Sequence, residues 1–167
     1  MKISVDTVRE LRAQSGAGIM DCRNALVEVA GDIEKALQLL KERSLVKVEK
    51  KKNRATSQGL VEAYIHAGGR IGALVEVNCE TDFVARTDEF KELAHNLAMQ
   101  VAAIPPQFIS QDEASEVDEL DPQADCLLQQ AYIKDPTLSV QDVINQTIAR
   151  VGENIKVSRF SRFALGE

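Results

Sequence analysis

The first third of the chain has apolar residues spaced three and four positions apart, which is the period of an α-helix. Three helices fit residues 1–53. They follow an N-cap at Ser4 and begin again at Ile19 and at Ile33. Between them, Gly16-Ala17-Gly18 and Gly31-Asp32 supply a tight turn, a stop and a new N-cap. The pattern predicts a three-helix bundle of about 45 residues, a size that is marginally stable alone and needs a neighbouring domain or a partner.

One face of each helix carries an apolar stripe that a bundle would bury. The stripes are Val5, Val8 and Leu11 in the first helix, Ile19, Cys22, Ala25, Leu26 and Val29 in the second, and Ile33, Ala36, Leu37 and Leu40 in the third. On the second helix Met20, Arg23, Asn24 and Val27 fall on the opposite face, so Met20 stays outside the bundle. A lone exposed Met is common, and an adaptable apolar side chain beside an Arg is also typical of a docking surface, so both interpretations stay open.

Apolar periodicity stops in a basic and then polar stretch. Its charged residues are Lys47, Lys50, Lys51, Lys52 and Arg54. We interpret residues 54–58 as a linker between a helical module, 1–53, and a second domain, 59–167. Positive charges complement the dipole at a helix C-terminus, so a solvated helix end explains them better than a phosphate-binding patch.

From Leu60 onwards the period changes to two, which is the period of a β-strand. Val61, Ala63, Ile65 and Ala67 alternate with Leu60, Glu62, Tyr64 and His66, and Ile71, Ala73, Val75 and Val77 continue the alternation. Gly68-Gly69 between the two runs predicts a β-hairpin with a tight two-residue turn. A third strand beside the hairpin is expected near the C-terminus, where Val157, Phe160, Phe163 and Leu165 alternate with polar residues.

Helices are predicted between the hairpin and the last strand. They run from an N-cap at Thr87 through Phe90 and Val101 to Pro105-Pro106, around residues 124–131, and from Ser139 to Gly152. Asp142, three positions after Ser139, completes a capping motif. Residues 107–125 contain seven acids and no Lys or Arg, which predicts a solvated loop. The fold class is therefore α+β: a three-helix bundle, a basic linker, and a small antiparallel sheet packed with helices.

The composition is that of a folded globular protein, with 44% apolar and 28% charged residues among 167. The longest apolar stretches fall far short of the roughly 20 residues that a membrane span needs. Met1-Lys2-Ile3 leads into a helix pattern rather than a signal sequence, so a cytosolic location without membrane contact is expected. The three cysteines are scattered and form no CxxC pair, which suits reduced thiols.

No metal or cofactor site is expected from the sequence. His66 and His95 are the only imidazoles, and neither has neighbours at the spacing that metal ligands use. The acids of residues 107–125 lack the alternating spacing and the central glycine of a calcium loop.

The net charge of -6 is divided unevenly along the chain. Residues 1–54 carry 12 Lys and Arg against 8 acids, and residues 55–167 carry 8 against 18. A basic end can indicate nucleic-acid binding, but this one lacks interleaved aromatic residues and the acidic remainder would be repelled by phosphates. We therefore expect no direct contact with nucleic acid.

The best candidate for function is the segment Cys79-Glu80-Thr81-Asp82-Phe83-Val84-Ala85, which places a carboxylate beside one of only seven Phe and Tyr residues. Connecting segments lie on the surface, so Phe83 either folds back onto the core or is offered to a partner. In the first case Phe83 packs under the next helix, with Asp82 or Thr87 as the cap. Spacing alone leaves both interpretations open.

Two long motifs closely resemble the elongation factor Ts family. They are Ser15-Gly16-Ala17-Gly18-Ile19-Met20-Asp21-Cys22-Arg23-Asn24-Ala25-Leu26, followed by Gly31-Asp32, and Glu76-Val77-Asn78-Cys79-Glu80-Thr81-Asp82-Phe83-Val84-Ala85. The likeness extends to the final strand at Arg162-Phe163. It implies a guanine nucleotide exchange factor for elongation factor Tu, the GTPase that delivers aminoacyl-tRNA, in the cytoplasm or, for a plastid member, in the stroma. Such a factor acts by binding and needs neither covalent catalysis nor a cofactor.

The resemblance also implies roles for individual residues. The family's Thr-Asp-Phe-Val segment corresponds to Thr81, Asp82, Phe83 and Val84. It would press into the GTPase near the magnesium and phosphate site and dislocate the magnesium ion, with Phe83 as the wedge. The helical module is similar to a ubiquitin-associated fold and would dock through Met20 and Arg23. Longer members have two core units where this chain has one, so a homodimer is expected to supply the second core surface.

Two other classes of function compete with this interpretation. A binding adaptor would use the helical module to recognise a ubiquitin-like or helical ligand and would leave nucleotide kinetics unchanged. A thiol enzyme would use Cys79 as its nucleophile, but no motif places a base beside that residue.

Overall fold

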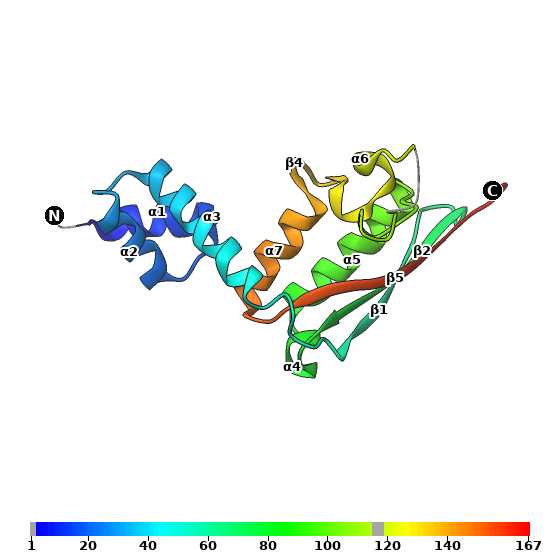
Figure 1. Ribbon diagram of the computed structural model, residues 1–167, viewed down its shortest axis with the longest axis horizontal. Helices are drawn as coiled ribbons and strands as arrows, with labels where there is room; N and C mark the ends of the chain where they lie inside the picture. Colours follow the sequence, from blue (N-terminus) through cyan, green and yellow to red (C-terminus); the bar gives the residue numbers. More distant parts are fainter. Residues whose placement is uncertain (1–2, 115–118) are drawn as a thin grey trace. The chain divides into compact units, whose positions relative to one another are not determined.

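The computed structural model describes residues 3–114 and 119–167. The chain divides into two compact units, Met1–Asn53 and Arg54–Glu167 (Figure 1). Each unit has a hydrophobic core of its own.

The first unit consists of three helices, α1 (Val5–Ser15), α2 (Ile19–Glu28) and α3 (Ile33–Glu49). Ser4 caps α1 by accepting a hydrogen bond from the Thr7 amide, and Asp32 caps α3 in the same way, as the sequence predicts. Gly16 ends α1 in the left-handed backbone conformation. Because α3 continues to Glu49, the basic stretch begins inside a helix rather than in a linker.

Six buried residues form the core of this unit. They are Leu11, Cys22, Ala25, Leu26, Ala36 and Leu40. Val5 and Ile19, which the sequence places on the buried stripes, are exposed. Each is the first residue of its helix, and helical side chains lean toward the N-terminus, so these two extend past the end of the core. The stripe prediction is wrong at both positions.

The second unit is built on an antiparallel sheet. Its strands are β1 (Gln58–Ile65), β2 (Ile71–Cys79) and β5 (Ile155–Ala164), in the order β1-β2-β5. The predicted hairpin and third strand are confirmed, but the predicted two-residue turn is wrong. The His66 amide donates to the Ile71 carbonyl at 2.9 Å, so four residues, 67–70, connect the strands. Gly68 and Gly69 both have positive φ there, which explains why glycine occupies these positions.

Helices cover one face of this sheet in the part of the chain that the structure describes. Helix α5 (Asp88–Ala103) lies across β1 and β2, and α7 (Val140–Val151) packs against α5 (Figure 1). Thr87 caps α5, and Ser139 and Asp142 form the predicted capping box at the start of α7. The buried core between sheet and helices includes Val75, Val77, Phe90, Leu93, Leu97 and Ile144.

Helix α5 covers the more polar face of β1 and leaves its more apolar face exposed. Glu62 and Tyr64 pair with Val75 and Ala73, which are buried, so these polar residues share the face that α5 covers. The apolar Val61 and Ile65 are 61% and 66% exposed. The helix-covered face accommodates Glu62 because His95 Nδ1 of α5 lies 3.1 Å from its carboxylate.

Between α5 and α7 the structure departs from the sequence prediction. The expected short helix is replaced by α6 (Pro122–Asp125), a 3-10 turn at Leu127–Gln129, and a small hairpin of β3 (Ala131–Tyr132) and β4 (Asp135–Ser139). The buried Gln100 side chain donates to the Gln130 side chain and to the Ala131 carbonyl, both at 3.1 Å. These side-chain bonds replace the local bonds that a helix would make, which is why helical spacing was misleading here.

The two ends of the predicted acidic loop bind each other, and its Phe108 carbonyl accepts a hydrogen bond of 2.9 Å from the Leu127 amide. The amides of Gln107 and Phe108 donate to the Asp125 carbonyl at 2.8 and 3.0 Å. Glu116 and Asp118, which belong to the same prediction, lie outside the described residues.

Cys22, Cys79 and Cys126 are buried free thiols, in agreement with the expectation of reduced cysteines. Within the described ranges, no helix combines the length and the apolar character that crossing a membrane requires.

Candidate functional site

The segment that the sequence singles out forms a one-turn helix at the end of the sheet. Helix α4 (Asp82–Ala85) follows β2 directly, and Thr81 is its N-cap, accepting a hydrogen bond from the Val84 amide at 3.4 Å. Thr87 then caps α5, so two capped helices follow one another within a few residues. Figure 1 shows α4 at the end of the sheet that lies farther from the C-terminus.

Phe83 projects from this turn into solvent. Its side chain is 77% exposed, although the rings of Phe and Tyr are among the largest sources of buried apolar area in proteins. Packing of Phe83 under the next helix, the alternative that spacing left open, is therefore not what the structure shows. Ala85 is buried instead and anchors the turn to the sheet.

Asp82 forms an ion pair with a residue of the same segment. Its carboxylate lies 2.9 Å from the Arg86 guanidinium, and the Arg86 side chain is largely exposed while that of Asp82 is about half exposed. A carboxylate in the first turn also interacts favourably with the positive end of a helix, but one turn gives only a small dipole. This ion pair was not predicted from the sequence. The spacing of four residues between Asp82 and Arg86, which places side chains on one face of a helix, could have indicated it.

Thr81 differs from the other three residues of the motif because it faces the protein. Its amide donates to Glu153 Oε2 at 3.0 Å and its hydroxyl to Glu153 Oε1 at 2.6 Å. Sequence reasoning missed Glu153, which is 72 positions away. No local pattern signals a contact of that kind.

Glu80 is held by the same part of the chain. Its carboxylate accepts a hydrogen bond of 2.7 Å from the Asn154 amide and lies 3.5 Å from the Arg54 guanidinium. The Asn154 side chain donates to the Arg54 carbonyl at 3.0 Å. Residues from three distant parts of the sequence therefore meet at the base of α4.

Cys79 lies under the α4 turn with its thiol inside the protein. The thiol donates to the Thr81 carbonyl at 3.1 Å. Burial, and secondarily the negative charge of Glu153, raises the pKa of Cys79 above the ordinary thiol value. A raised pKa disfavours the reactive thiolate, so the arrangement argues against Cys79 as a catalytic nucleophile. Among residues 3–114 and 119–167, no group of His, Cys, Asp or Glu side chains could hold a metal ion.

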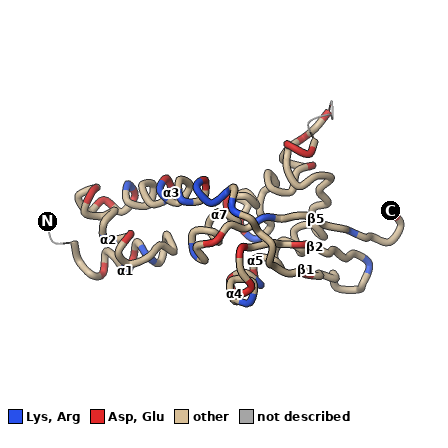
Figure 2. The backbone as a smooth tube through the Cα atoms, turned by 60° about the horizontal axis from the view of Figure 1, so that its bottom comes forward, with Lys and Arg blue, Asp and Glu red and all other residues tan. Residues whose placement is uncertain are grey.

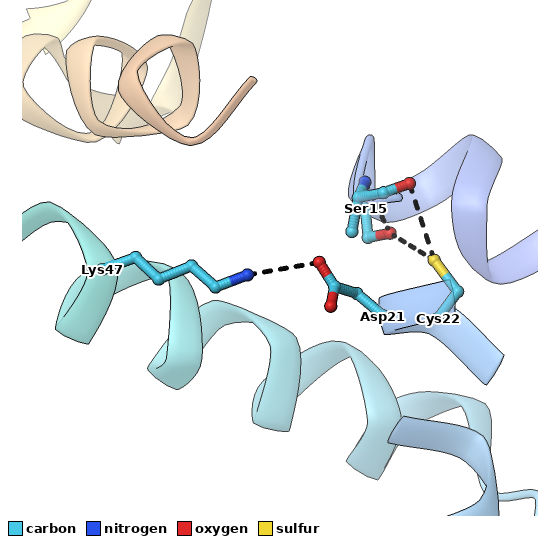
Figure 3. A network of polar contacts seen from close by, with 5 residues as sticks. Ser15, Asp21, Cys22 and Lys47 are labelled. Atoms are coloured by element: carbon cyan, nitrogen blue, oxygen red, sulfur yellow. Dashed lines mark hydrogen bonds and ion pairs between the residues drawn. The ribbon is translucent and has the colours of Figure 1, made fainter. Parts of the chain in front are cut away.

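The second candidate surface is the outer face of α2, in the other unit. Met20 is 59% exposed, and Arg23 and Val27 are exposed beside it. The neighbouring Asp21 accepts a hydrogen bond of 3.2 Å from Lys47 of α3, and Cys22 points inward, 3.6 Å from the Ser15 hydroxyl (Figure 3). The helix therefore presents Met20 outward while its inner face stays in the core.

Several basic residues of α3 are paired within the first unit. Figure 2 shows Lys and Arg concentrated along α3 and at its C-terminal end. Arg43 lies 2.6 Å from Glu28, Lys35 lies 3.0 Å from Asp32, and Lys47 pairs with Asp21. In the basic stretch itself, Lys47 pairs with Asp21, Lys52 lies 3.7 Å from Glu49, and Arg54 lies 3.5 Å from Glu80. These pairs favour the solvated-helix interpretation over a phosphate-binding patch.

Comparisons with known proteins agree with the motifs. The family described as "Elongation factor TS" matches residues 4–120. A curated protein named "Elongation factor Ts" from Thermotoga neapolitana is 44% identical over an alignment of 196 positions, with 100% of this chain and 99% of that protein covered. Proteins of the same name from Thermoanaerobacter sp. (strain X514) and Syntrophomonas wolfei are each 46% identical over 195 residues, covering 99% of this chain and 96% and 91% of theirs. The chain therefore belongs to the elongation factor Ts family of translation elongation factors.

Proposed function

We propose that this chain is a guanine nucleotide exchange factor for elongation factor Tu, and that the α4 turn, Thr81 to Val84, enters the GTPase near its magnesium and phosphate site. The observation that supports this most strongly is Phe83, a large apolar side chain that is 77% exposed on a turn whose base is held by hydrogen bonds. An exposed aromatic side chain on a well-ordered segment is typical of residues that carry binding energy in protein interfaces.

Exchange by such a factor requires binding alone. A factor that binds the nucleotide-free GTPase more tightly than the GDP-bound GTPase must, by linkage, weaken GDP binding by the same free energy. Insertion of the Phe83 ring would favour a discrete alternative packing of the GTPase, because packed interiors do not deform continuously. Displacing magnesium removes the charge that neutralises the diphosphate, which accelerates GDP release.

Asp82 would bring a negative charge to the region that retains magnesium. In the free protein this charge is shared with Arg86 at 2.9 Å. An exposed ion pair of this kind contributes only up to about 1 kcal/mol, so groups of the partner can compete for either member.

The first unit would provide a second point of attachment. We assign to it a ubiquitin-associated-like fold and docking through Met20 and Arg23, with residues 54–58 as the linker to the core domain. Both side chains are exposed on a helix whose other face is buried. Two linked contacts raise the effective concentration of the second one, so docking by α2 would keep the factor bound while α4 disturbs the nucleotide site.

The uncovered face of the sheet supports a homodimer as the working form. It carries Val61 and Ile65 of β1, Leu74 of β2 and Phe163 of β5, all exposed, and the exposed Leu165 follows directly after β5. Phe163 pairs with Gly72 and lies in one row with Ile65, so three strands contribute to one apolar surface. Contiguous apolar surface of this kind marks an interaction site, and a second copy would supply the second core surface that longer relatives carry in one chain.

Sedimentation equilibrium tests the dimer directly. We expect the wild-type chain to sediment as a dimer at micromolar concentration and Leu74→Asp as a folded monomer. The dimer is wrong if the wild-type chain remains monomeric at the concentrations where it accelerates exchange.

The exchange function is tested by the release rate of a fluorescent GDP analogue from purified elongation factor Tu under excess unlabelled GDP. Saturable acceleration with increasing amounts of this protein is the expected result. If a cognate, active GTPase shows no acceleration, the chain is not an exchange factor for it, and the adaptor class becomes the better description.

A further inference from the structure

At the base of the α4 turn, residues 80–81 and residues 153–154 bind each other, each through one carboxylate and one backbone amide. The Thr81 amide and hydroxyl donate to the two oxygens of Glu153, at 3.0 and 2.6 Å. In the other direction, the Asn154 amide donates to the Glu80 carboxylate at 2.7 Å. Each of the two adjacent segments therefore binds the main chain of the other through its carboxylate. Hydrogen bonds to a charged acceptor are about twice as strong as neutral ones.

These contacts fix Thr81 on every side. Its hydroxyl accepts from the Val84 amide at 3.4 Å while donating to Glu153. Its carbonyl accepts from the Cys79 thiol at 3.1 Å and from the Ala85 amide at 3.3 Å. All the polar groups of Thr81 are thus engaged inside the unit, so this residue of the motif supports the turn rather than offering groups to a partner.

The position of Glu153 follows from the way α7 ends. Gly152 adopts the left-handed conformation with φ of 80°, which stops the helix and turns the chain into β5. Ile155, at the start of β5, pairs with Cys79, at the end of β2. The sheet register therefore brings the residues just before β5 beside the residues just after β2.

A helix of four residues has no stability of its own, because nucleating a helical turn is unfavourable and longer segments are needed to compensate. The orientation of Phe83 must therefore come from tertiary contacts. Ala85 provides one by burial, and Glu153 provides the other at the start of the turn. Neither contact occupies the exposed face that carries the Phe83 ring.

We infer that Glu153 is a positioning residue for nucleotide exchange: by binding both donors of Thr81 it holds the α4 turn in the geometry that presents Phe83 to the GTPase. This inference rests on the proposed exchange function. A loop ordered in advance loses less conformational freedom on binding, so the inserted state is more populated.

Replacing Glu153 by Gln tests the inference with almost no change in shape. The amide side chain offers one acceptor oxygen where the carboxylate offers two, so one of the two Thr81 bonds is lost. We expect the maximal rate of GDP release at saturating factor to fall about tenfold, and the half-saturating concentration to change by less than about twofold because docking by α2 is unaffected.

The matched control is Asp142→Asn. Asp142 Oδ2 accepts from both the amide and the hydroxyl of Ser139, at 3.0 and 2.9 Å, so a carboxylate again binds the two donors of one residue, here through a single oxygen and at the opposite end of α7. Its replacement removes the charge of the carboxylate, as Glu153→Gln does, and should leave the maximal exchange rate unchanged. A second readout needs no partner: hydrogen exchange of the Val84 and Ala85 amides should accelerate in Glu153→Gln and not in Asp142→Asn.

The outcomes separate the two proposals. If the wild-type protein does not accelerate GDP release, the exchange function fails, and the inference fails with it. If the wild-type protein is active and Glu153→Gln matches Asp142→Asn in maximal rate, the inference is wrong and the exchange function stands. If circular dichroism shows Glu153→Gln to be unfolded, Thr81→Val removes the hydroxyl bond from the other side, and an unchanged maximal rate in that variant overturns the inference.

Discussion

The turn at α4 presents Phe83 to solvent and the outer face of α2 presents Met20, but the two surfaces are held in place differently. Met20 stands on a ten-residue helix whose other face lies in an apolar core. Phe83 stands on a four-residue helix whose base is tied by hydrogen bonds to a residue 72 positions away. The shape of α2 is thus produced locally, whereas the shape of α4 is produced by the rest of its domain.

This difference predicts which changes each surface tolerates. A binding surface on a helix that packs against a core is held in place by many small apolar contacts. Loss of the core therefore destroys the surface, whereas a single substitution on the surface only weakens binding. A surface held by a few charge-assisted bonds depends on each of them. The α2 surface should therefore be lost when its core is disrupted, and the α4 surface should lose its function on a single substitution.

The largest effect is expected from Leu26→Ala in the core of the first unit. Leu26 is fully buried, and truncating a buried Leu costs about 3 to 4 kcal/mol. A module of this size has little stability to lose. Two-dimensional NMR should show loss of dispersed resonances from residues 3–53 and their retention elsewhere.

Leu45→Ala is the matched control for that experiment, because Leu45 lies in the same unit and is exposed. It should lower stability by less than about 1 kcal/mol. If Leu26→Ala leaves the resonances of the first unit dispersed, that unit does not depend on this core in the way proposed here.

Phe83→Ala should produce the next largest effect, and on exchange rather than on stability. An aromatic hot spot contributes about 2 to 3 kcal/mol, so GDP release should slow roughly 30- to 150-fold. Because the ring is exposed, the free energy of unfolding should change by less than about 0.5 kcal/mol. Stopped-flow nucleotide release and thermal denaturation measure the two quantities.

Ile133→Ala removes another exposed apolar side chain from the second unit and should leave exchange unchanged. A Phe83→Ala protein that is unfolded by circular dichroism would instead assign the ring to the core.

Met20→Ala should have a smaller effect, confined to affinity. The loss of one adaptable apolar contact at the edge of an interface costs about 1 kcal/mol, so the dissociation constant for nucleotide-free elongation factor Tu should rise about fivefold. Isothermal titration calorimetry measures it, and Val46→Ala, at an exposed position on α3, is the control. Equal affinities for the wild-type and Met20→Ala proteins would remove Met20 from the docking surface.

The smallest effect concerns the thiol under α4. Burial raises the pKa of Cys79, so the folded state retains the proton more tightly than the unfolded state does. For an acid with a raised pKa, this contribution to stability is present at neutral pH and is lost as the pH rises above the ordinary thiol pKa of about 8.5. Iodoacetamide at pH 8 should therefore modify Cys79 more slowly in the native protein than in urea, as followed by peptide mass spectrometry. Rapid native modification would mean that the base of the turn opens readily.

Much of the fold was predictable because it depends on short-range chemistry. Helix starts at Ser4, Asp32, Thr87 and Ser139 follow from side chains that bond amides three residues away. Alternation of period two identified the strands of the sheet. The predictions that failed are the two-residue turn, the helix around 124–131, and the burial of Val5 and Ile19. The helix prediction failed because Gln100, distant in sequence, binds Gln130 and Ala131.

The sequence by itself determined the local elements, the reduced state expected of the cysteines, and the two motifs that the family shares. Only the tertiary structure decided which face of β1 is covered, because Glu62 and Val61 alternate equally well in either orientation until α5 and His95 choose one. It also decided that Phe83 is exposed while Thr81 faces inward. The physical reason is of the same kind in both cases, because hydrogen-bond partners distant in sequence become neighbours only when the domain folds. Helix α5 brings His95 to Glu62 by packing on β1 and β2, and the pairing of β2 with β5 brings Glu153 to Thr81. No periodicity within a short window contains that information.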